Sequence, residues 1–462
     1  MRASLEQWKS ASRLWDIVYT RAAGPHAIER ASLERFASLV RFARKRSPFY
    51  GNAYRTLPDR DLRPSEVPIV TRPQLMAHFD DWVTDTEVTF AGVAEFIDDR
   101  THIGQRFLGR YVVWKSSGTS GSPGLYVQDS DGLATFDALM AAHLDPARFV
   151  GGRAWDLLRS GNRAALVAAT GEHFASIASW QRLCRGNPWI SARSFSILTP
   201  LPELVEELNH YRPDYLASYP TMLALLAEEQ QAGRLHIHPN GLWSGGECLS
   251  PDARWVIDEA FHGTVVNEYG SSECMSMAFG CTEGWLHVNS DWVVLEPVDR
   301  HYQPTPAGEA SHTVLLTNLA NHVQPIIRYD LGDSIVVNPE PCPCGNSLPA
   351  IQVQGRRDDV LALHTAQGAV VRLLPLALTT VVEEASHVHR FQIVQTAADC
   401  LALRLPLDQA DRQAAGVAAK RALRFYLDQQ SLGNVQVTVD ERGPSADPRS
   451  GKLKEVLLET ST

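Results

Sequence analysis

The sequence predicts an α/β protein with a large N-terminal domain built on mostly parallel strands and a small α+β domain after it. The chain has 462 residues, which is more than one compact core usually contains. From about residue 111, short apolar runs alternate with amphipathic stretches, a pattern typical of strands joined by crossover helices. The last hundred or so residues combine strands with a helix. We therefore place the domains at residues 1–356 and 357–462.

The individual elements are separated by loop and proline signals. Residues 1 to about 50 predict amphipathic helices, because Leu33, Phe36 and Val40 recur at helical spacing. Prolines then separate short elements. Further along, we predict strands at residues 111–114, 164–169, 216–219, 263–267, 313–317, 335–337 and 435–439, and helices at residues 201–209, 221–231 and 411–428.

Composition and charge argue against several classes of protein. The hydrophobic and charged fractions, 44% and 21%, are those of an ordinary globular chain. A formal net charge of -10 disfavours a general nucleic-acid surface. The first residues have no apolar signal core, and Arg372 and Pro375 interrupt the longest apolar stretch, so we expect a soluble cytoplasmic protein with no membrane partner. Seven cysteines without small-scaffold spacing make a disulfide framework improbable.

A loop rich in Gly, Ser and Thr follows the strand at residues 111–114. Residues 116–124 read Ser-Ser-Gly-Thr-Ser-Gly-Ser-Pro-Gly. Such a loop can point backbone N–H groups and hydroxyls at phosphates, and its glycines permit close approach of the backbone. It is not a Walker loop, because no Gly-Lys-Ser/Thr follows. The alternative is a flexible surface loop.

Four further segments could each be an ordinary loop when taken alone. Residues 267–273, Asn-Glu-Tyr-Gly-Ser-Ser-Glu, follow a strand and end in a carboxylate that could hold Mg²⁺. Asp333, after the turn in Arg-Tyr-Asp-Leu-Gly-Asp, could accept hydrogen bonds from two ribose hydroxyls. The other two segments are Gly-Arg-Arg-Asp-Asp at residues 355–359 and Pro-Arg-Ser-Gly-Lys-Leu-Lys at residues 448–454.

Together and in this order, the five segments resemble the adenylate-forming superfamily of acyl-CoA synthetases and adenylation domains. The resemblance runs from about residue 110 to residue 454. It implies an AMP-forming ligase with a large N-terminal domain of parallel or mixed sheets and a small mobile C-terminal domain. Within the superfamily, the compact length and the Cys/His set described below are most similar to the phenylacetate–coenzyme A ligase branch.

The resemblance also implies a role for each matching residue. The ATP phosphates would be cradled by Ser117, Gly118, Thr119, Ser120 and Gly121. The adenine would be bordered by Gly245, Gly246 and Glu247 and stacked on by Tyr269, next to Gly270. Ser272 and Glu273 match the family's Thr-Glu pair, with Glu273 the Mg²⁺ ligand. Asp333 and Arg356 would hold the ribose, Asp358 would be the hinge and Lys452 the catalytic lysine.

The sequence departs from the family pattern at two places. The phosphate loop usually has a lysine after its proline, but Gly124 takes that position here. The glycine-rich substrate segment of the family is not recognisable, and residues 168–175 read Ala-Ala-Thr-Gly-Glu-His-Phe-Ala instead. These differences bear on ATP affinity and on the identity of the acid.

Four soft ligands form a candidate zinc site. Cys281 and His287 have five residues between them, and Cys342 and Cys344 flank a proline. Three thiolates and one imidazole suit tetrahedral Zn²⁺ and leave no open position, so the site would be structural. The alternative is four unrelated residues, and the resemblance to the branch favours zinc. We expect the remaining cysteines Cys184, Cys248 and Cys400 to be plain core residues.

The expected reaction has two halves: a carboxylate attacks Mg·ATP to give an acyl-adenylate and pyrophosphate, and coenzyme A then displaces AMP. An aromatic acid is expected, with Phe136, His173, Phe174 and Tyr219 as candidate pocket residues. Core packing is the alternative for these side chains. An amine, a hydroxyl or a carrier-protein thiol is the rival acceptor, and a non-catalytic nucleotide sensor is the rival from another class. A homodimer is left open.

Overall fold

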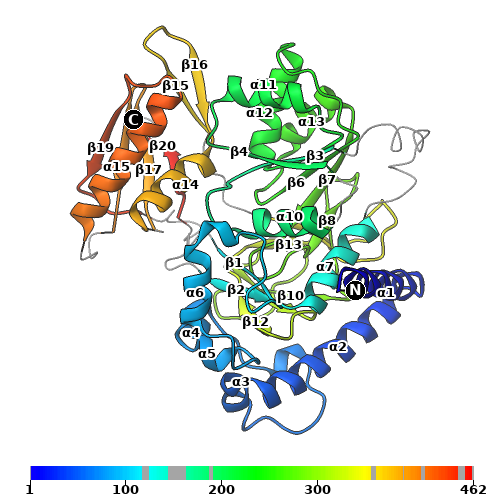
Figure 1. Ribbon diagram of the computed structural model, residues 1–462. Helices are drawn as coiled ribbons and strands as arrows, with labels where there is room; N and C mark the ends of the chain where they lie inside the picture. Colours follow the sequence, from blue (N-terminus) through cyan, green and yellow to red (C-terminus); the bar gives the residue numbers. More distant parts are fainter. Residues whose placement is uncertain are drawn as a thin grey trace.

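The computed structural model describes residues 2–116, 124–143, 163–186, 191–354, 360–388, 390–406, 411–445 and 453–459. The chain begins with helices, of which the first three fill the region of residues 1 to about 50 that was predicted as helical. They are α1 (Arg2–Ala22), α2 (Pro25–Arg46), α3 (Pro48–Ala53), α4 (Arg72–Ala77), α5 (Phe79–Trp82) and α6 (Phe90–Asp98), with 3-10 turns η1 (Pro64–Glu66) and η2 (Arg100–His102). Proline at the first turn of α2 and α3 suits a helix start, where its missing N–H is not needed. These helices run along the lower and outer side of the large unit (Figure 1).

A nine-stranded mixed sheet is the centre of the large unit. Its order is β13-β14-β9-β8-β7-β6-β5-β3-β4. The strands β3 (Arg163–Ala168), β4 (Ser191–Ser196), β5 (Tyr215–Ser218), β6 (Gly241–Gly245) and β7 (Thr264–Tyr269) are parallel. The strands β8 (Ala278–Gly280), β9 (Leu286–Val288), β14 (Ala350–Val353) and β13 (Ile335–Val337) continue the sheet in antiparallel pairs. The predicted parallel α/β region is therefore confirmed, with an antiparallel extension.

Helices join the parallel strands and bury their inner faces. They are α10 (Ala175–Gly186), α11 (Leu201–Tyr211), α12 (Pro220–Gln231) and α13 (Pro251–Phe261). Apolar side chains of α11, α12 and α13 pack with β3, β5 and β6 in one buried cluster, which includes Leu204, Leu226 and Ile257. Burial of such side chains contributes about 1.5–3 kcal/mol each, so this layer dominates the local stability.

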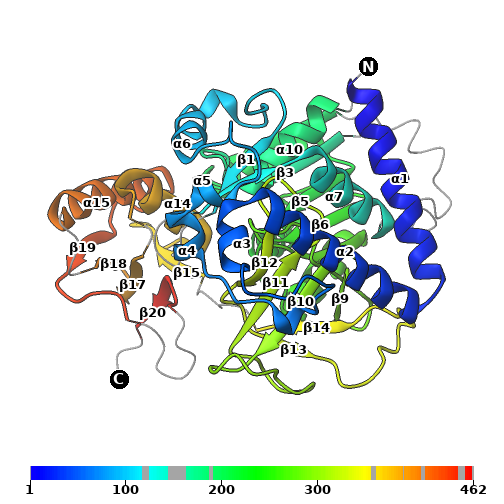
Figure 2. The same ribbon diagram turned by 90° about the horizontal axis from the view of Figure 1, so that it is seen from below.

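Two smaller sheets lie below the central one and carry residues of the site. One pairs β1 (Val112–Lys115) with β2 (Leu125–Gln128). The other has the order β10-β11-β12, formed by β10 (Val293–Val298), β11 (Thr313–Asn318) and β12 (Ile326–Asp330). The helix α7 (Ser130–His143) follows β2 and packs against α1. In Figure 2 both α1 and α2 lie on the outside of this part of the molecule.

The residues after 360 form a separate small unit, at the left of Figure 1. It contains the hairpin β15 (Leu361–His364) and β16 (Val370–Leu373), the helices α14 (Pro375–Ser386) and α15 (Arg412–Gln429), and a four-stranded sheet of order β19-β18-β17-β20. The sheet strands are β17 (Gln392–Ala397), β18 (Cys400–Arg404), β19 (Gln436–Asp440) and β20 (Val456–Leu458). This is the predicted small α+β unit. The expected boundary at residues 356–357 lies outside the described residues.

Polar contacts join the small unit to the large one. Arg372 of β16 forms an ion pair with Glu228 of α12, and the side-chain amide of Gln430 donates to the carbonyl of Leu198 at 3.0 Å. The carboxylates of Glu383 and Glu384, near the end of α14, also face the large unit. Glu384 lies 3.6 Å from Arg100, measured from Oε2 to Nη2. The two units therefore meet through charged groups as well as apolar packing.

The carboxylates of Glu383 and Glu384 face a third carboxylate, Glu172, and the cations Lys115 and Arg100. Lys115 and Arg100 are both ion-paired with Glu172. Burial raises the pKa of Glu383 to about 8, the ammonium of Lys115 partly offsets this, and Glu172 and Glu384 add to the rise. Ionisation of Glu383 would therefore weaken the contact between the large and small units, because it buries a negative charge beside Glu172 and Glu384.

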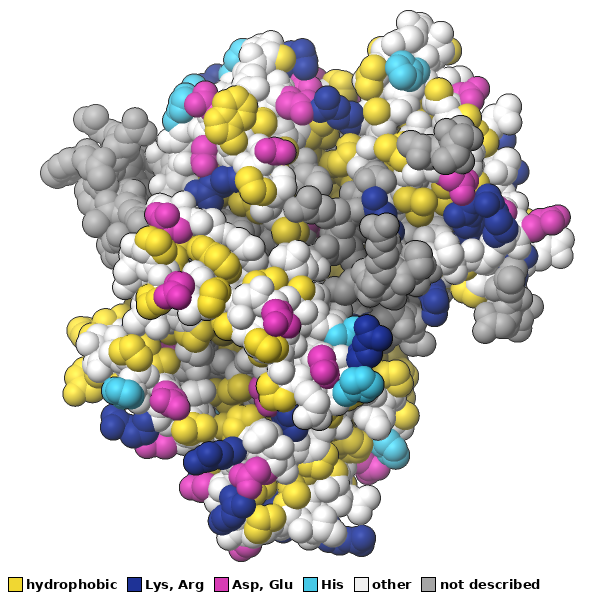
Figure 3. Space-filling model, turned by 180° about the vertical axis from the view of Figure 1, so that it is seen from behind, with side chains coloured by type: hydrophobic (Ala, Val, Ile, Leu, Met, Phe, Trp, Pro, Cys, Tyr) yellow, Lys and Arg dark blue, Asp and Glu magenta, His cyan; other side chains and the backbone are white. Residues whose placement is uncertain are grey.

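The outer surface carries interspersed charges of both signs on the face shown in Figure 3. That distribution agrees with the net charge of -10, which disfavours a general nucleic-acid surface. Among the described residues, no helix is both long enough and apolar enough to cross a bilayer.

We predict that stability falls as the pH rises toward 8, and that Glu383→Gln removes this dependence. The folded-state pKa of Glu383 lies above its ordinary 4.5. Its contribution is thus fully present below about pH 4.5 and is lost as the pH rises through about 8, with a slope of roughly 1.4 kcal/mol per pH unit between them. Urea unfolding of both proteins across this pH range measures the difference. The exposed Glu259 of α13, changed to Gln, is the control, and equal slopes in all three proteins would contradict the assignment.

Candidate active site

The candidate site lies at the carboxyl ends of the parallel strands β5, β6 and β7. Gly245 at the end of β6 is in register with Glu268 of β7, so the segments after these two strands leave the sheet side by side. In open α/β sheets this edge is where ligands bind, because the loops that follow parallel strands all meet there. The predicted segments at residues 245–247 and 267–273 are thereby brought together.

The Ser-Gly-Gly-Glu segment packs on the start of α12. Gly246 has φ +82°, and a Cβ at this position would lie 3.0 Å from the ring of Tyr219, so glycine is required for two reasons. Glu247 accepts hydrogen bonds from the backbone N–H and the hydroxyl of Thr221, at 3.2 and 2.7 Å. A carboxylate at a helix N-terminus is favourably placed, so the segment is held firmly against the sheet edge.

Tyr269 joins the second and third predicted segments. Its hydroxyl donates to Oδ2 of Asp333 at 2.8 Å. Burial and the neighbouring Asp333 carboxylate raise the pKa of Tyr269 far above its usual value, so the phenol stays protonated and continues to donate. Next to Asp333, the carbonyl of Ser334 accepts from the backbone N–H of Gln354 at 2.7 Å, which brings the end of β14 to the same place.

Glu273 is buried at the centre of a cluster of three donors. Its side chain is only 3% exposed. Oε1 accepts from the hydroxyls of Tyr126 and Tyr329 at 2.6 and 2.8 Å, and from Nη2 of Arg72 at 3.2 Å. A buried carboxylate needs such partners, because an unpaired charge in a dry environment is costly. Glu273 is therefore a carboxylate held in one orientation by three protein donors.

The sequence did not predict the three residues that donate hydrogen bonds to Glu273. They lie 201, 147 and 56 residues away from it, for Arg72, Tyr126 and Tyr329 respectively. Arg72 begins α4, Tyr126 is in β2 and Tyr329 is in β12, and none belongs to a pattern that singles it out. Of the three donors, only Tyr329 could have been found from the sequence, because it lies in the segment at residues 328–333 that contains Asp333.

The two ends of the predicted phosphate loop are held together. The backbone N–H of Ser116 donates to the carbonyl of Gly124 at 2.9 Å, and the N–H of Gly124 donates to the hydroxyl of Ser116 at 2.9 Å. A Cβ at Gly124 would lie 2.5 Å from the hydroxyl oxygen of Tyr126. A side chain here would collide with the tyrosine that donates to Glu273, so packing favours glycine at residue 124.

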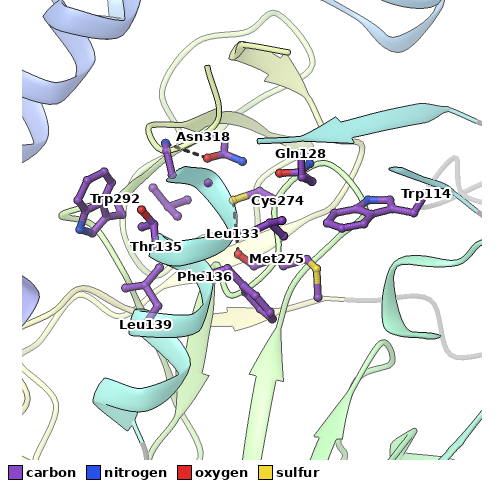
Figure 4. A pocket seen from close by; sticks show the side chains of 13 residues that line it. Trp114, Gln128, Leu133, Thr135, Phe136, Leu139, Cys274, Met275, Trp292 and Asn318 are labelled. Atoms are coloured by element: carbon purple, nitrogen blue, oxygen red, sulfur yellow. Dashed lines mark hydrogen bonds between the residues drawn. The ribbon is translucent and has the colours of Figure 1, made fainter. Parts of the chain in front are cut away.

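A small, partly open pocket lies beside Cys274, the neighbour of Glu273, at the start of α7 (Figure 4). Its volume is about 20 Å³. Phe136, Leu133 and Leu139 of α7 line one side, and Trp114, Cys274 and Met275 line the other. The indole of Trp114 donates to the carbonyl of Ser272 at 2.8 Å, which ties this wall to the strand-end segment. A cavity of this size accommodates about one water molecule.

The four residues expected around the acid do not share one pocket among the described residues. Phe136 lines the pocket beside Cys274. Phe174 and Tyr219 pack instead in a small apolar cluster with Ile177. His173 is buried against Phe96, with ring centroids 6.1 Å apart, and burial lowers its pKa. The role of this set in acid binding stays a prediction.

The four predicted metal ligands come together at the edge of the central sheet. The ligand atoms of Cys281, His287, Cys342 and Cys344 all lie within 4.8 Å of one another. The Sγ atoms of Cys281 and Cys342 are 3.7 Å apart, and Nε2 of His287 is 3.2 Å from Sγ of Cys344. Nδ1 of His287 lies 2.9 Å from the carbonyl of Leu348, so this nitrogen carries the proton and Nε2 presents its lone pair to the thiols.

Some predictions fall outside this geometry or differ from it. Ser117, Gly118, Thr119, Ser120 and Gly121 of the loop, together with Arg356, Asp358 and Lys452, lie outside the described residues. Gly270 is packed closely, since a Cβ there would come within 3.2 Å of the backbone nitrogen of Ser276. The expectation that Cys184, Cys248 and Cys400 are core residues was wrong: Cys248 is exposed and the other two are half-buried, because they lie on helix, loop and strand positions that face outward.

Comparison with known proteins places the fold. No family model matches the chain. The structure is similar to 2-hydroxyisobutyryl-CoA ligase in complex with 2-HIB-AMP and CoA, with 21% identity, 93% of this chain and 89% of that chain covered, and a TM-score of 0.57. The same enzyme with 2-HIB-AMP in the postadenylation state gives 20% identity, 94% and 90% coverage and a TM-score of 0.54. The predicted fold of an adenylate-forming enzyme is thereby confirmed, while the phenylacetate branch stays a prediction.

One sequence relative adds a partial likeness. Protein CapK of Staphylococcus aureus is 25% identical over 162 residues, which are 34% of this chain and 34% of that protein. The match thus spans about a third of CapK.

We predict that Arg72→Met strongly destabilises the protein, because it leaves Glu273 buried without its cation. Breaking a buried ion pair from one side costs roughly 3–5 kcal/mol. The control is Arg41→Met, which breaks the solvent-exposed pair of Arg41 with Asp61 and should cost at most about 1 kcal/mol. Chemical denaturation of the three proteins compares these values, and equal costs would show that Glu273 does not depend on Arg72.

Proposed function

We propose that this chain uses ATP to convert a carboxylic acid into an acyl-adenylate and then transfers the acyl group to coenzyme A. The main support is the convergence of three separate segments at the carboxyl edge of β6 and β7: residues 245–247, the Tyr269–Asp333 pair and the buried Glu273. The fold is that of a ligase whose structures hold an acyl-adenylate and CoA. A protein with this fold and this constellation has the parts that adenylation needs.

In this proposal the strand-end segments bind the nucleotide. Gly246 is exposed and has no side chain, so its backbone would be open to the base on the side that the ring of Tyr219 does not cover. Tyr269 would stack on adenine, and Asp333, already an acceptor for the phenol, would receive a ribose hydroxyl together with Arg356. The loop at residues 117–121 would hold the phosphates between its clamped ends, Ser116 and Gly124.

Glu273 is the proposed Mg²⁺ ligand. The three protein donors all bind Oε1. A carboxylate oxygen is the kind of ligand that Mg²⁺ prefers. Arg72 and the two tyrosines would hold this carboxylate in one orientation. When bound, Mg²⁺ would neutralise the charge of the phosphates during transfer. Arg72 adds a fixed positive charge beside the same oxygen.

Lys452 is the proposed catalytic cation, supplied by the small unit, and Asp358 is the proposed hinge. The segment just after Lys452 is attached to the small sheet, since the amide of Gln392 donates to the carbonyl of Lys454 at 2.8 Å. Movement of the small unit about its boundary would therefore carry Lys452 to and from the nucleotide.

The decisive test of the function is ATP–pyrophosphate exchange with a panel of carboxylic acids, with and without coenzyme A. Acid-dependent exchange and a thioester product support the proposal. Exchange without thioester formation would favour the rival acceptors: an amine, a hydroxyl or a carrier-protein thiol. The absence of exchange with every acid would favour a nucleotide-binding sensor on the same fold.

We predict that Lys452→Ala slows adenylate formation about a hundredfold and leaves thioester formation from pre-made acyl-adenylate nearly unchanged. Removing a cation aimed at developing phosphoryl charge costs roughly 3 kcal/mol. Single-turnover measurement of each half-reaction separates the two effects. Lys420→Ala, on α15 of the same unit, serves as the control. An equal loss in both half-reactions would assign Lys452 a structural role.

For the acid, we keep an aromatic substrate as the proposal. The pocket of about 20 Å³ beside Cys274 is far smaller than the ~150 Å³ that accommodates benzene in an apolar protein cavity. An aryl acid would therefore require Phe136 or Met275 to move aside. The panel should include benzoates, arylacetates, short acids, amino acids and 2-hydroxyisobutyrate, the acid of the ligase with this fold. Acetate or an amino acid outrunning every aryl acid would exclude the aromatic assignment.

We also propose that the Cys/His cluster holds a structural zinc ion. Two thiolates on a tetrahedral Zn²⁺ with bonds of about 2.3 Å lie about 3.8 Å apart. The observed distance between Cys281 and Cys342 is 3.7 Å. His287 is in β9 and pairs with Ala350 of β14, while Cys342 and Cys344 lie in the loop between β13 and β14. The ion would thus connect three antiparallel strands at the end of the central sheet.

We predict about one zinc per chain, lost in Cys344→Ser. Because metal binding contributes directly to folding, both this variant and strong chelation should lower the melting temperature. Cys248→Ser, an exposed cysteine away from the cluster, should keep its metal and its stability. Metal analysis of freshly purified protein provides the measurement, and a metal-free wild-type protein would end this proposal.

A further inference from the structure

The outward face of α1 is uncharged and rich in aromatic side chains. From Trp8 onward, its exposed residues recur at intervals of three and four. They are Trp8, Ala11, Ser12, Trp15, Val18, Tyr19 and Ala22. The residues Trp8, Trp15 and Tyr19 are 74%, 75% and 79% exposed. We call these seven residues the α1 stripe.

The charged residues of α1 after Trp8 point the other way, into the protein. Lys9 donates to Ser130 and Asp131 of α7, at 2.9 and 3.1 Å. Arg21 reaches Asn289 and Asp291, each at 2.9 Å.

Two further charged side chains of α1 are engaged in the same way. Arg13 lies over the ring of Trp292, 5.0 Å from its centroid, and Asp16 is ion-paired with Arg35 of α2. A surface helix ordinarily buries its apolar face and turns its charges to water. In α1 the apolar residues Ile17 and Leu14 do pack into the core, but the charged side chains after Trp8 also contact the protein, and the face left outward is uncharged.

The α1 stripe is complementary to itself. Trp8, Trp15 and Ala22 are spaced by seven residues, as are Ala11 and Val18, which is the spacing of a helix–helix seam. If two α1 helices pair antiparallel about Trp15, Trp8 faces Ala22. In the same pairing Ala11 faces Tyr19, and Ser12 faces Val18. Each large side chain away from the centre then meets a smaller one, as close packing requires.

The exposed area of the α1 stripe is large enough for a stable dimer interface. Each aromatic side chain buries about 150–250 Å², and about three quarters of that is exposed here, so the three aromatic residues would bury roughly 700–1,100 Å² over two copies. Val18 and the flanking residues add to this, which brings the total to the ~1,000 Å² expected of a specific interface. An isolated chain rarely exposes a continuous apolar patch of this kind.

We propose that a second copy of this chain covers the α1 stripe, giving a homodimer in which the two α1 helices pair antiparallel with the two-fold axis at Trp15. The helix lies along an outer edge of the molecule, where a second copy can approach (Figure 2). An isologous pairing of this kind is the commonest form of homo-oligomer. The inference does not depend on the proposed enzymatic function.

Analytical ultracentrifugation over a range of concentrations tests the assembly. The wild-type chain should sediment as a dimer. Trp15→Glu should raise the dimer dissociation constant at least about thirtyfold, because it removes an aromatic pair at the centre of the interface. The control is Trp255→Glu, which changes a tryptophan that is 65% exposed on α13 and should leave the dimer intact. Circular dichroism should show both variants folded. A monomeric wild-type chain, including one that instead binds anionic vesicles, would overturn the proposal.

Cysteine cross-linking tests the antiparallel geometry. Mixed Ser12→Cys and Val18→Cys chains should form a disulfide-linked dimer under mild oxidation. Each variant alone should stay at the wild-type background, because its own two copies would be offset by about 9 Å along the helix axis, beyond disulfide reach. Efficient self-linking of either variant would indicate a parallel pair and contradict the proposed axis. Running the wild-type chain beside them measures the background from the exposed Cys248.

Discussion

The buried carboxylate of Glu273 is the constraint around which the candidate site is arranged. Burying it requires donors, and three segments supply them: the start of α4, strand β2 and strand β12. Two of these segments bring a neighbour to the site. Gly124, at one end of the predicted phosphate loop, directly precedes β2, while β12 leads directly into the turn before Asp333. One satisfied anion therefore holds the phosphate side and the ribose side of the proposed nucleotide site in register.

The same carboxylate explains why residue 124 is a glycine. Tyr126 needs the space beside Gly124 in order to reach Glu273, so a side chain at residue 124 and this hydrogen bond exclude each other. A positive charge is nonetheless present, on Arg72, but it comes from α4 and lies against the carboxylate. This positive charge comes from a residue that is remote in sequence from Glu273, which no loop motif can reveal.

Charge placement also distinguishes the outer parts of the molecule. Where the small unit meets the large one, Glu172, Glu383 and Glu384 share the two cations Lys115 and Arg100. Burial raises the pKa of Glu383 there, which favours its protonated form. On α1 the described charged side chains contact α2, α7 and the segment at residues 289–292, and aromatic side chains are left facing out. Both arrangements are unusual for surfaces that stay in water, and both indicate that the free, isolated form of the chain is not its only state.

The sequence by itself determined the features that depend on neighbours along the chain. Helical spacing predicted the N-terminal helices and alternation predicted the parallel strands, while the resemblance to the adenylate-forming superfamily singled out the segments that meet at β6 and β7. The pairing of Cys281 and His287 with Cys342 and Cys344 was also predicted, because soft ligands have a distinctive chemistry. Only the tertiary structure decided that Arg72, Tyr126 and Tyr329 surround Glu273, and which side of α1 faces water, because burial depends on contacts between segments far apart in sequence.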